Sequence, residues 1–403
     1  MGRSRVIPFY SPHEVSFVRG NGVYLYDKDG KRYLDMGAGI ATSSLGHCNP
    51  SMIEALVKKA HEGPWHVSNL YTIPEAECLA KKLTDFSFAD MAFFANSGAE
   101  AVECGLKIAR SYQSGIGRHE RYKVLTLRRS FHGRTYATCS ANEPAGFLAA
   151  LYPYVDWFAS VNPDIQSVRD EVSKGNVGTI LLEPVQGEGG IHVLSFDFLR
   201  ELRTLCDEQD ILLFFDCVQC GSGRTGKFFA HEYSGITPDI CSLAKGFGGG
   251  FPVGACLINE RAGQFVSQRM HGSTYGGNPL ATTVACAVVT EILSPGFLER
   301  VEKNGNYLME KLSDMSGRFP DIITDVRGMG LMIGLQISDV ISAPDLSKKL
   351  IEFGILAIGT VNVSSNVLRL TPPLIISREE IDEFLHMFEA FLRKQEACLS
   401  RVH

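Results

Sequence analysis

The feature of this sequence that most restricts its fold is an alternation of short apolar runs with helix-like segments, from about residue 50 to residue 285. The helix-like segments include residues 99–112 and 195–209, and they separate runs with the composition of buried strands. This alternation predicts an α/β domain with a mostly parallel central sheet flanked by helices. The expected strands are residues 92–94, 123–127, 179–183, 211–216, 240–244 and 254–258.

The two ends of the chain lack this alternation. Residues 15–35 predict a small antiparallel meander, because glycine-containing turns separate runs rich in strand-forming residues. Long helical segments and turns rich in glycine or proline follow residue 286. We therefore expect a small α/β domain that combines both termini and packs against the large sheet domain. The expected limits are 1–48 and 286–403 for the small domain and 49–285 for the large one.

The composition excludes several classes of partner. Of the 403 residues, 45% are hydrophobic and 21% are charged, which is usual for a globular protein. A net charge of -6 and a pI near 6.0 give no electrostatic reason to expect a nucleic acid or an anionic membrane as partner. Apolar runs are too short for a membrane span, and the first residues lack the apolar core of a signal peptide. We therefore expect a cytoplasmic address.

Two polar residues stand where strands of the predicted sheet end. Asp216 follows five apolar residues, and Lys245 follows the next predicted strand along the chain. Ligands of open α/β sheets bind beyond the carboxyl ends of strands, so we expect both side chains to face a ligand. A carboxylate in such apolar surroundings is costly without a cationic partner, and the glycines after Lys245 let a bulky ligand approach the backbone. The alternative for each residue is a solvated strand end.

A third element is the segment NSGAEAVE, in which Ser97 and Glu100 fit a capping box at the start of a helix. Free N–H groups and the helix dipole favour an anion at this end, and Gly98 lets a phosphate lie against the backbone. A lysine suits an aldehyde, an aspartate suits a basic ring nitrogen, and the helix end suits a phosphate. Pyridoxal 5'-phosphate combines these three groups, and it acts as an electron sink while its ring nitrogen is protonated.

The stretch FFDCVQCGSGRTGKFF, residues 214–229, also matches three unrelated motifs. Cys217 and Cys220 form a CxxC without a second pair of ligands, so we expect no metal site and interpret most of the eleven cysteines as buried thiols. The GxGxxG from Gly221 begins too far past the strand for a dinucleotide site, and Phe228 stands where a P-loop needs serine or threonine. A nucleotide-binding protein and a zinc or thiol-redox protein remain the alternatives.

Seven motifs in order make the sequence resemble the class III, fold type I aminotransferases, and within them the acetylornithine and ornithine aminotransferases. The resemblance covers nearly the whole chain and implies dependence on pyridoxal 5'-phosphate and a homodimer with shared active sites. The motifs are NSGAEAVE, SFHGRT, LLEPVQGEGG, FFDCVQCGSGRTG, SLAKGFGGGFPVGA, HGSTYGGNPLA and LRLTPPL.

The resemblance implies cofactor contacts residue by residue. Lys245 would hold the cofactor aldehyde as a Schiff base and move the substrate proton, while Asp216 would pair with the ring nitrogen. Gln219 would contact the ring hydroxyl, and Phe131 and Val218 would enclose the ring from its two faces. The phosphate would be held by Ser97, Gly98, Ala99 and, from the partner subunit, Thr274.

The resemblance also implies substrate contacts. Arg369 would bind the alpha-carboxylate of glutamate or 2-oxoglutarate through a bidentate fork, to which arginine is better suited than lysine. Arg134 would bind the alpha-carboxylate of the ornithine-type substrate, which leaves the distal amine at the cofactor. Glu188 would screen Arg369 while the cationic substrate is bound and would release it for the diacid. Ser273 would lie near the substrate, and Tyr10 resembles a tyrosine that holds the carboxylate in ornithine enzymes.

Departures from the family pattern bear on the substrate. Cys217 replaces the glutamate of the family motif DEVQTG and so changes a neighbour of Asp216. Ile40 stands where ornithine enzymes carry a tyrosine and where acetylornithine and 4-aminobutyrate enzymes carry an isoleucine, whereas Tyr10 favours ornithine. We expect transfer of the distal amino group of N2-acetyl-L-ornithine to 2-oxoglutarate, as in arginine biosynthesis, by ping-pong half-reactions. The alternative donors are ornithine, N-succinyl-diaminopimelate and 4-aminobutyrate.

Overall fold

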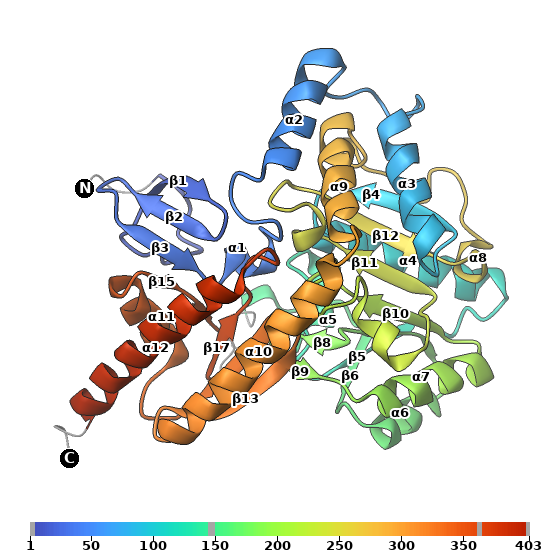
Figure 1. Ribbon diagram of the computed structural model, residues 1–403. Helices are drawn as coiled ribbons and strands as arrows, with labels where there is room; N and C mark the ends of the chain where they lie inside the picture. The colour runs from blue at the N-terminus through green and yellow to red at the C-terminus, as the bar shows by residue number, and fades with distance from the viewer. Residues whose placement is uncertain (1–4, 144–149, 361–364, 400–403) are drawn as a thin grey trace.

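The computed structural model describes residues 5–143, 150–360 and 365–399, and its centre is a seven-stranded sheet (Figure 1). The strand order is β4-β12-β11-β10-β7-β5-β6. Pairing is parallel except at β12, which runs antiparallel to both of its neighbours. The strands are β4 (Met91–Ala95), β5 (Lys123–Leu127), β6 (Phe158–Val161), β7 (Val177–Leu182), β10 (Leu212–Asp216), β11 (Ile240–Leu243) and β12 (Gly254–Ile258).

Helices cover the central sheet on both faces, and strand β10 shows how its residues are shared between two hydrophobic layers. Leu212 and Phe214 pack with residues of α4, whereas Leu213 and Phe215 join the layer that contains α7. Two buried faces explain why these strands are continuous apolar runs. The helices are α2 (Pro50–Glu62), α3 (Pro74–Phe86), α4 (Gly98–Gly115), α5 (Tyr136–Ala141), α6 (Ile165–Val172), α7 (Phe196–Gln209), α8 (Glu260–Gly263) and α9 (Pro279–Ile292), with the 3-10 turns η2 (Ala230–Ser234) and η3 (Lys245–Phe247).

The two ends of the chain lie side by side on the left of Figure 1. Strand β15 pairs in parallel with β3, so the C-terminal segment completes a sheet in the order β1-β2-β3-β15. A second sheet has the order β13-β14-β17-β16. The elements of the two chain ends are β1 (Phe17–Asn21), β2 (Tyr24–Asp27), β3 (Arg32–Asp35), α1 (Ala38–Ala41), α10 (Phe297–Arg318), β13 (Ile323–Met329), β14 (Met332–Ile337), α11 (Ala343–Glu352), β15 (Ile355–Leu356), β16 (Ile358–Gly359), β17 (Val367–Leu370) and α12 (Arg378–Leu399). The short strands β8 (Val185–Gln186) and β9 (His192–Val193) lie in the middle of the chain and pair with each other.

The structure confirms the predicted α/β class, the six predicted strands of the central sheet and the N-terminal meander. The prediction missed β6, whose sequence FASV is short and contains a polar serine, so its apolar content does not stand out. The expected domain limits at residues 48 and 285 stay a prediction.

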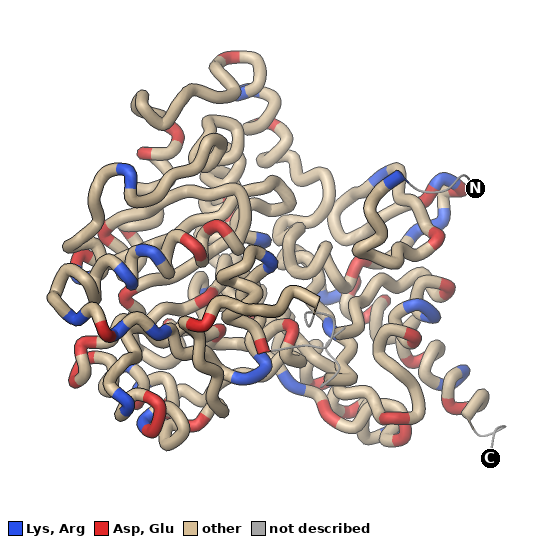
Figure 2. Tube along the Cα trace, turned by 180° about the vertical axis from the view of Figure 1, so that it is seen from behind, with Lys and Arg blue, Asp and Glu red and all other residues tan. Residues whose placement is uncertain are grey.

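Charged residues of both signs are interspersed along the chain in the view of Figure 2, in line with the small net charge of -6. Within the described residues, no single helix is both long and apolar enough to cross a membrane. Helices α9 and α10 together are long and apolar enough to meet this criterion, but a bend of 69° separates them.

Two glycines of α10 provide a matched test of packing. A Cβ at Gly305 would lie 2.3 Å from the carbonyl carbon of Gly330, whereas a Cβ at Gly317 would have no neighbour within 4 Å. We expect Gly305→Ala to lower the free energy of unfolding by about 1–3 kcal/mol through overpacking. Gly317→Ala should raise it by about 0.5–1 kcal/mol, because alanine favours the helix. Urea unfolding of both variants measures the shifts, and equal shifts would contradict this packing.

Candidate active site

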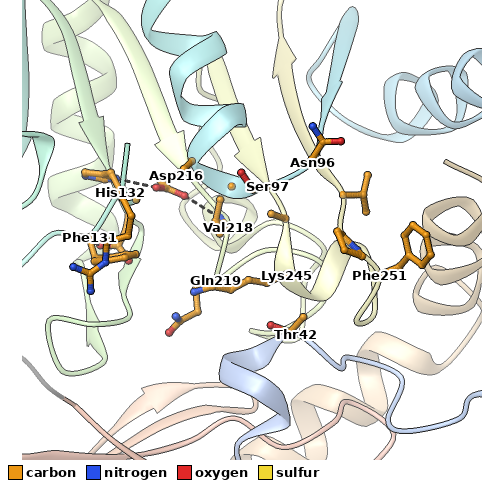
Figure 3. Close-up of a pocket in the computed structure, with 18 of the residues that line it drawn as sticks. Thr42, Asn96, Ser97, Phe131, His132, Asp216, Val218, Gln219, Lys245 and Phe251 are labelled. Carbon is orange, nitrogen blue, oxygen red and sulfur yellow. Dashed lines mark hydrogen bonds and ion pairs between the residues drawn. The ribbon is translucent and has the colours of Figure 1, made fainter. Parts of the chain in front are cut away.

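A cavity of about 390 Å³ opens at the carboxyl ends of β10 and β11, and its size suits a small organic ligand (Figure 3). Asp216 ends β10, and Lys245 begins η3 just beyond the parallel neighbour β11. The rule that ligands bind beyond strand ends therefore places both side chains correctly. The predicted residues that line the cavity are Ser97, Gly98, Ala99, Phe131, Arg134, Asp216, Val218, Gln219 and Lys245.

Asp216 is buried, and both of its carboxylate oxygens are hydrogen-bonded. Its Oδ2 lies 2.8 Å from Nδ1 of His132, and its Oδ1 accepts from the Val218 N–H at 3.0 Å and from the Ser242 hydroxyl at 3.2 Å. Figure 3 shows the contacts to His132 and Val218 as dashed lines. These partners hold the carboxylate in one orientation and offset the cost of its burial.

A second buried carboxyl, Glu183, follows the last residue of β7 and also lines the cavity. It accepts hydrogen bonds from the N–H groups of Phe131 at 2.9 Å and Gly187 at 3.0 Å. Burial raises the pKa of Glu183 to about 7, and the nearby charge of Asp216 adds to the rise while His132 opposes it. The carboxyl is thus close to half protonated at neutral pH, which limits the negative charge beside Asp216.

Lys245 differs from the other lining residues in its backbone. Its φ of 49° lies in the left-handed region, which non-glycine residues seldom adopt and which occurs more often at functional sites. Burial lowers the pKa of the Lys245 ammonium, although Glu188 acts in the opposite direction. A lowered pKa increases the share of neutral amine, the form that attacks a carbonyl carbon.

The first residues of α4 form the end of the cavity that suits an anion. Ser97 caps this helix, and its hydroxyl oxygen accepts from the Glu100 N–H at 3.3 Å. The second bond of the predicted capping box, from the Ser97 N–H to the Glu100 carboxylate, is replaced. Glu100 instead accepts from the backbone N–H and the side-chain amide of Asn96. A Cβ at Gly98 would lie 2.8 Å from Val218, so this glycine lets the helix start approach the loop after β10.

Arg369 and Glu188 pair with each other next to the cavity rather than lining it. Arg369 is buried on β17, and its Nη1 donates to Oε1 of Glu188 at 2.5 Å. Burial raises the pKa of Glu188, but the positive charges of Arg369 and Lys245 outweigh this and lower it overall. Arg134 is exposed, and its guanidinium carbon lies 5.1 Å from the centroid of the Phe131 ring.

Three further predicted residues, in addition to Arg369 and Glu188, do not line the cavity of this chain. Ser273 reaches its edge, since its hydroxyl oxygen accepts from the side chain of Asn96 at 3.2 Å. Thr274 is exposed and lines a separate surface pocket together with Asn69. Tyr10 is 85% exposed near the N-terminus.

Several residues that line the cavity were not predicted from the sequence as site residues, among them Thr42, Asn96 and His132. Asn96 and His132 belong to recognised motifs, so motif membership was an available signal for them. Thr42 comes from the end of α1, far along the chain from the strand ends (Figure 3). No local pattern reveals that the His132 imidazole meets the Asp216 carboxylate, because 84 residues separate them.

The cysteines of the CxxC motif are packing residues. Cys217 and Cys220 are buried, and Cys220 donates to the carbonyl oxygen of Asp216 at 3.7 Å. The hydrogen bond with Cys217, followed by burial, raises the pKa of the Cys220 thiol well above its usual value, which disfavours the reactive thiolate. Within the described residues, no group of three or more His, Cys, Asp or Glu side chains is arranged to hold a metal ion.

The glycines of the same stretch serve turns rather than a nucleotide site. Gly223 and Gly226 have φ values of 87° and 96°, which a glycine adopts without strain. Turns continue from the end of β10 to η2, so the stretch lacks the long helix whose N-terminus both nucleotide motifs require.

The residues present fit pyridoxal 5'-phosphate. The cavity joins a lysine amine, a buried carboxylate and a helix N-terminus, which match the aldehyde, the ring nitrogen and the phosphate of that cofactor. Two buried polar atoms of the lining, Nε2 of His132 and Oε1 of Gln219, have no hydrogen-bond partner in the described part of the chain. Unpaired buried polar atoms in a cavity indicate a polar ligand.

Known proteins of similar sequence and structure agree with this arrangement. Residues 9–392 match the family model of the class-III aminotransferases. The acetylornithine aminotransferase of Brucella melitensis is 44% identical to this chain, over 96% of this chain and 94% of that protein. The acetylornithine aminotransferase of Agrobacterium fabrum is also 44% identical, over 93% of each of the two chains. The ornithine aminotransferase of Toxoplasma gondii has a TM-score of 0.92 at 29% identity, covering 98% of this chain and 93% of that one. The N-acetylornithine aminotransferase of Stenotrophomonas maltophilia has a TM-score of 0.84 at 33% identity, over 96% and 98%.

Thiol burial leads to a testable pattern of alkylation. Cys48 and Cys398 are exposed, whereas Cys217, Cys220 and Cys241 are buried beside Asp216. We expect iodoacetamide to modify the exposed thiols, Cys78 included, in the folded protein within minutes and to modify these buried thiols only after unfolding. Peptide mass spectrometry before and after addition of guanidinium measures the pattern. Rapid modification of Cys217 or Cys220 in the folded protein would show that they are not inert packing residues.

Proposed function

The chain belongs to the class III aminotransferases, and on that premise we propose that it transfers the distal amino group of N2-acetyl-L-ornithine to 2-oxoglutarate. The products are N-acetyl-L-glutamate 5-semialdehyde and L-glutamate, which is a step of arginine biosynthesis. The observation that carries the proposal is the 44% identity to acetylornithine aminotransferases over nearly the whole length of both chains. Ile40, the residue typical of enzymes that do not use free ornithine, supports the same donor.

Pyridoxal 5'-phosphate, the cofactor of this family, supplies an electron sink and stores the amino group between two half-reactions. In our proposal Lys245 holds the cofactor aldehyde and then moves a proton at the substrate carbon that carries the amino group. Asp216, oriented by its bonds to His132 and Ser242, keeps the ring nitrogen protonated. Gln219 contacts the ring hydroxyl. Phe131 and Val218 would enclose the cofactor ring, and Ser97, Gly98 and Ala99 would hold its phosphate.

The pair formed by Glu188 and Arg369 supports a mechanism for accepting two different substrates. While the donor is bound, its carboxylate is held by Arg134 and its ammonium approaches Lys245. Glu188 then neutralises Arg369, whose charge would otherwise repel that ammonium. When glutamate or 2-oxoglutarate is bound, its alpha-carboxylate replaces Glu188 on the Arg369 fork.

We also propose a cytoplasmic homodimer in which each phosphate site is completed by Thr274 of the partner subunit. The position of this residue supports the proposal, since Thr274 of the same chain is exposed and lies outside its own cavity. Ser273 reaches the substrate side of the cavity through its bond to Asn96. Tyr10 is exposed, and its proposed contact with the substrate carboxylate is supported by the family resemblance alone.

A panel of amino donors tests the proposed function. With 2-oxoglutarate as acceptor, we expect kcat/KM for N2-acetyl-L-ornithine to exceed the values for ornithine, N-succinyl-diaminopimelate and 4-aminobutyrate by about tenfold or more, equivalent to about 1.4 kcal/mol of transition-state binding. Steady-state initial rates measure it, and a preference for free ornithine would overturn the choice of donor.

Two lysine variants serve as the matched controls of this panel. Lys245→Ala should abolish turnover and the absorbance of the lysine-bound cofactor. Lys227→Ala changes the exposed lysine of the apparent P-loop motif and should leave both unchanged. Wild-type turnover in Lys245→Ala would contradict the aminotransferase mechanism itself.

The proposed charge pair predicts an unequal effect of one substitution on the two substrates. In Glu188→Gln the charge of Arg369 is unscreened, so we expect kcat/KM for N2-acetyl-L-ornithine to fall by about tenfold. The value for L-glutamate should change by less than about threefold, because its carboxylate displaces Glu188 in any case. Glu310→Gln, which alters an exposed carboxylate bonded to Lys311, is the control. Equal losses for both substrates would exclude this screening role.

A further inference from the structure

Arg224 is a fully buried arginine in the loop that follows Asp216. Its Nη1 donates hydrogen bonds to two backbone carbonyls, that of Leu331 at 3.1 Å and that of Pro372 at 2.5 Å. Both acceptors belong to the C-terminal part of the chain, 107 and 148 residues away. One guanidinium thus joins the cofactor side of the cavity to the sheet that carries Arg369.

The two carbonyls lie at the same end of one strand pair. Strands β14 and β17 are antiparallel, with Ile333 opposite Leu370. Continuing this register by two residues brings Leu331 opposite Pro372, one residue before β14 and two after β17. Arg224 therefore closes the end of the β14–β17 ladder, where an arginine can satisfy two acceptors at once.

The backbone around Arg224 makes the same connection. The Leu331 N–H donates to the Arg224 carbonyl oxygen at 3.0 Å, so this pair of residues is joined in both directions. A Cβ at Gly330 would lie 2.5 Å from the carbonyl carbon of Thr225, so the β13–β14 turn contacts the loop directly. The loop after Asp216 and the β14–β17 pair are therefore in direct contact through both hydrogen bonds and packing.

The burial of Arg224 argues for a geometric role. Its Nη2 is buried and has no hydrogen-bond partner among the residues that the structure describes. Burial lowers the pKa of Arg224 to about 9, so the group is still charged at neutral pH. A buried charge whose hydrogen-bond partners are neutral carbonyls is costly, and the nearby charge of Asp35 offsets part of that cost.

We infer that Arg224 is the positioning residue of the acceptor carboxylate site, fixing the distance between Arg369 and the cofactor-facing residues Asp216 and Gln219. The inference rests on the proposed role of Arg369. Pro372 follows Arg369 by three residues, so loss of the bond to its carbonyl frees the end of β17 near the fork. Binding of the glutamate alpha-carboxylate, which uses that fork, is then weakened.

The donor carboxylate site has a different support. Arg134 lies directly before Thr135, which caps α5 on the flank of the central sheet. The Thr135 hydroxyl bonds to Glu103 of α4, and neither residue belongs to the strand pair that Arg224 joins. A change at Arg224 should therefore act on one substrate and spare the other.

The test compares the two amino donors, L-glutamate and N2-acetyl-L-ornithine, on the same preparation of the cofactor-loaded enzyme. Arg224→Lys keeps the charge but lacks the guanidinium, whose Nη1 donates both hydrogen bonds, and Arg224→Met removes both bonds. Single-turnover absorbance gives kcat/KM for each substrate. The ratio of the two values does not depend on the fraction of folded enzyme, so a destabilised variant remains informative. Arg203→Lys is the control, since Arg203 binds Asp239 in another part of the protein.

We expect the ratio of kcat/KM for L-glutamate to that for N2-acetyl-L-ornithine to fall by about tenfold in Arg224→Lys and further in Arg224→Met. KM for 2-oxoglutarate should rise while kcat and the absorbance of the lysine-bound cofactor are retained. The ratio in Arg203→Lys should stay within about twofold of the wild type.

Two results would overturn the inference, and they are distinguishable with Arg369→Lys in the same assay. If Arg369→Lys lowers the ratio and the Arg224 variants do not, the positioning role of Arg224 is wrong and the proposed acceptor site stands. If Arg369→Lys leaves the ratio unchanged, the acceptor site is assigned wrongly and the inference is lost with it.

Discussion

A carboxylate at the end of a fully buried strand is the constraint on which the rest of the site depends. Asp216 ends a strand whose side chains are covered on both faces, so its charge requires partners that the strand itself does not supply. The partners come from three places: the loop before α5, the neighbouring strand β11, and the backbone two residues on. Satisfying one buried charge thus fixes His132, Ser242 and Val218 around a common cavity. Asp216, Lys245 and Ser97, at the helix end, all line this cavity.

A second pair of charged groups, Arg369 and Glu188, lies on the other side of the cavity. Arg369 is buried and comes from a strand of the C-terminal part, and Glu188 comes from the loop after β8. Each is costly alone, so the two are stable only as a pair or with a ligand that takes the place of one of them. The fold holds the pair close to the cavity, and Arg224 ties the strand of Arg369 to the loop that follows Asp216. The cofactor side and the acceptor side are therefore parts of one connected structure.

The most conspicuous motifs of the sequence have plain structural explanations. Cys217 and Cys220 fill the core behind Asp216, and their raised pKa values keep them as thiols. Gly223 and Gly226 allow the turns that follow β10. Arg224, which lies between these glycines, makes hydrogen bonds to carbonyl oxygens 107 and 148 residues further along the chain. Conspicuous spacing is a weak guide here because cysteine and glycine are common wherever a tight, buried loop must form.

The sequence by itself determined the fold class, the order of the central strands along the chain and the positions of Asp216, Lys245 and Ser97. These follow from local rules: apolar runs become strands, strand ends face ligands, and a capped helix start attracts an anion. Only the tertiary structure decided which residues meet across the chain. His132 reaches Asp216 over 84 residues, and Arg224 reaches Pro372 over 148. Such pairs are set by how sheets and loops pack against each other, and no short-range pattern of residue types encodes that packing.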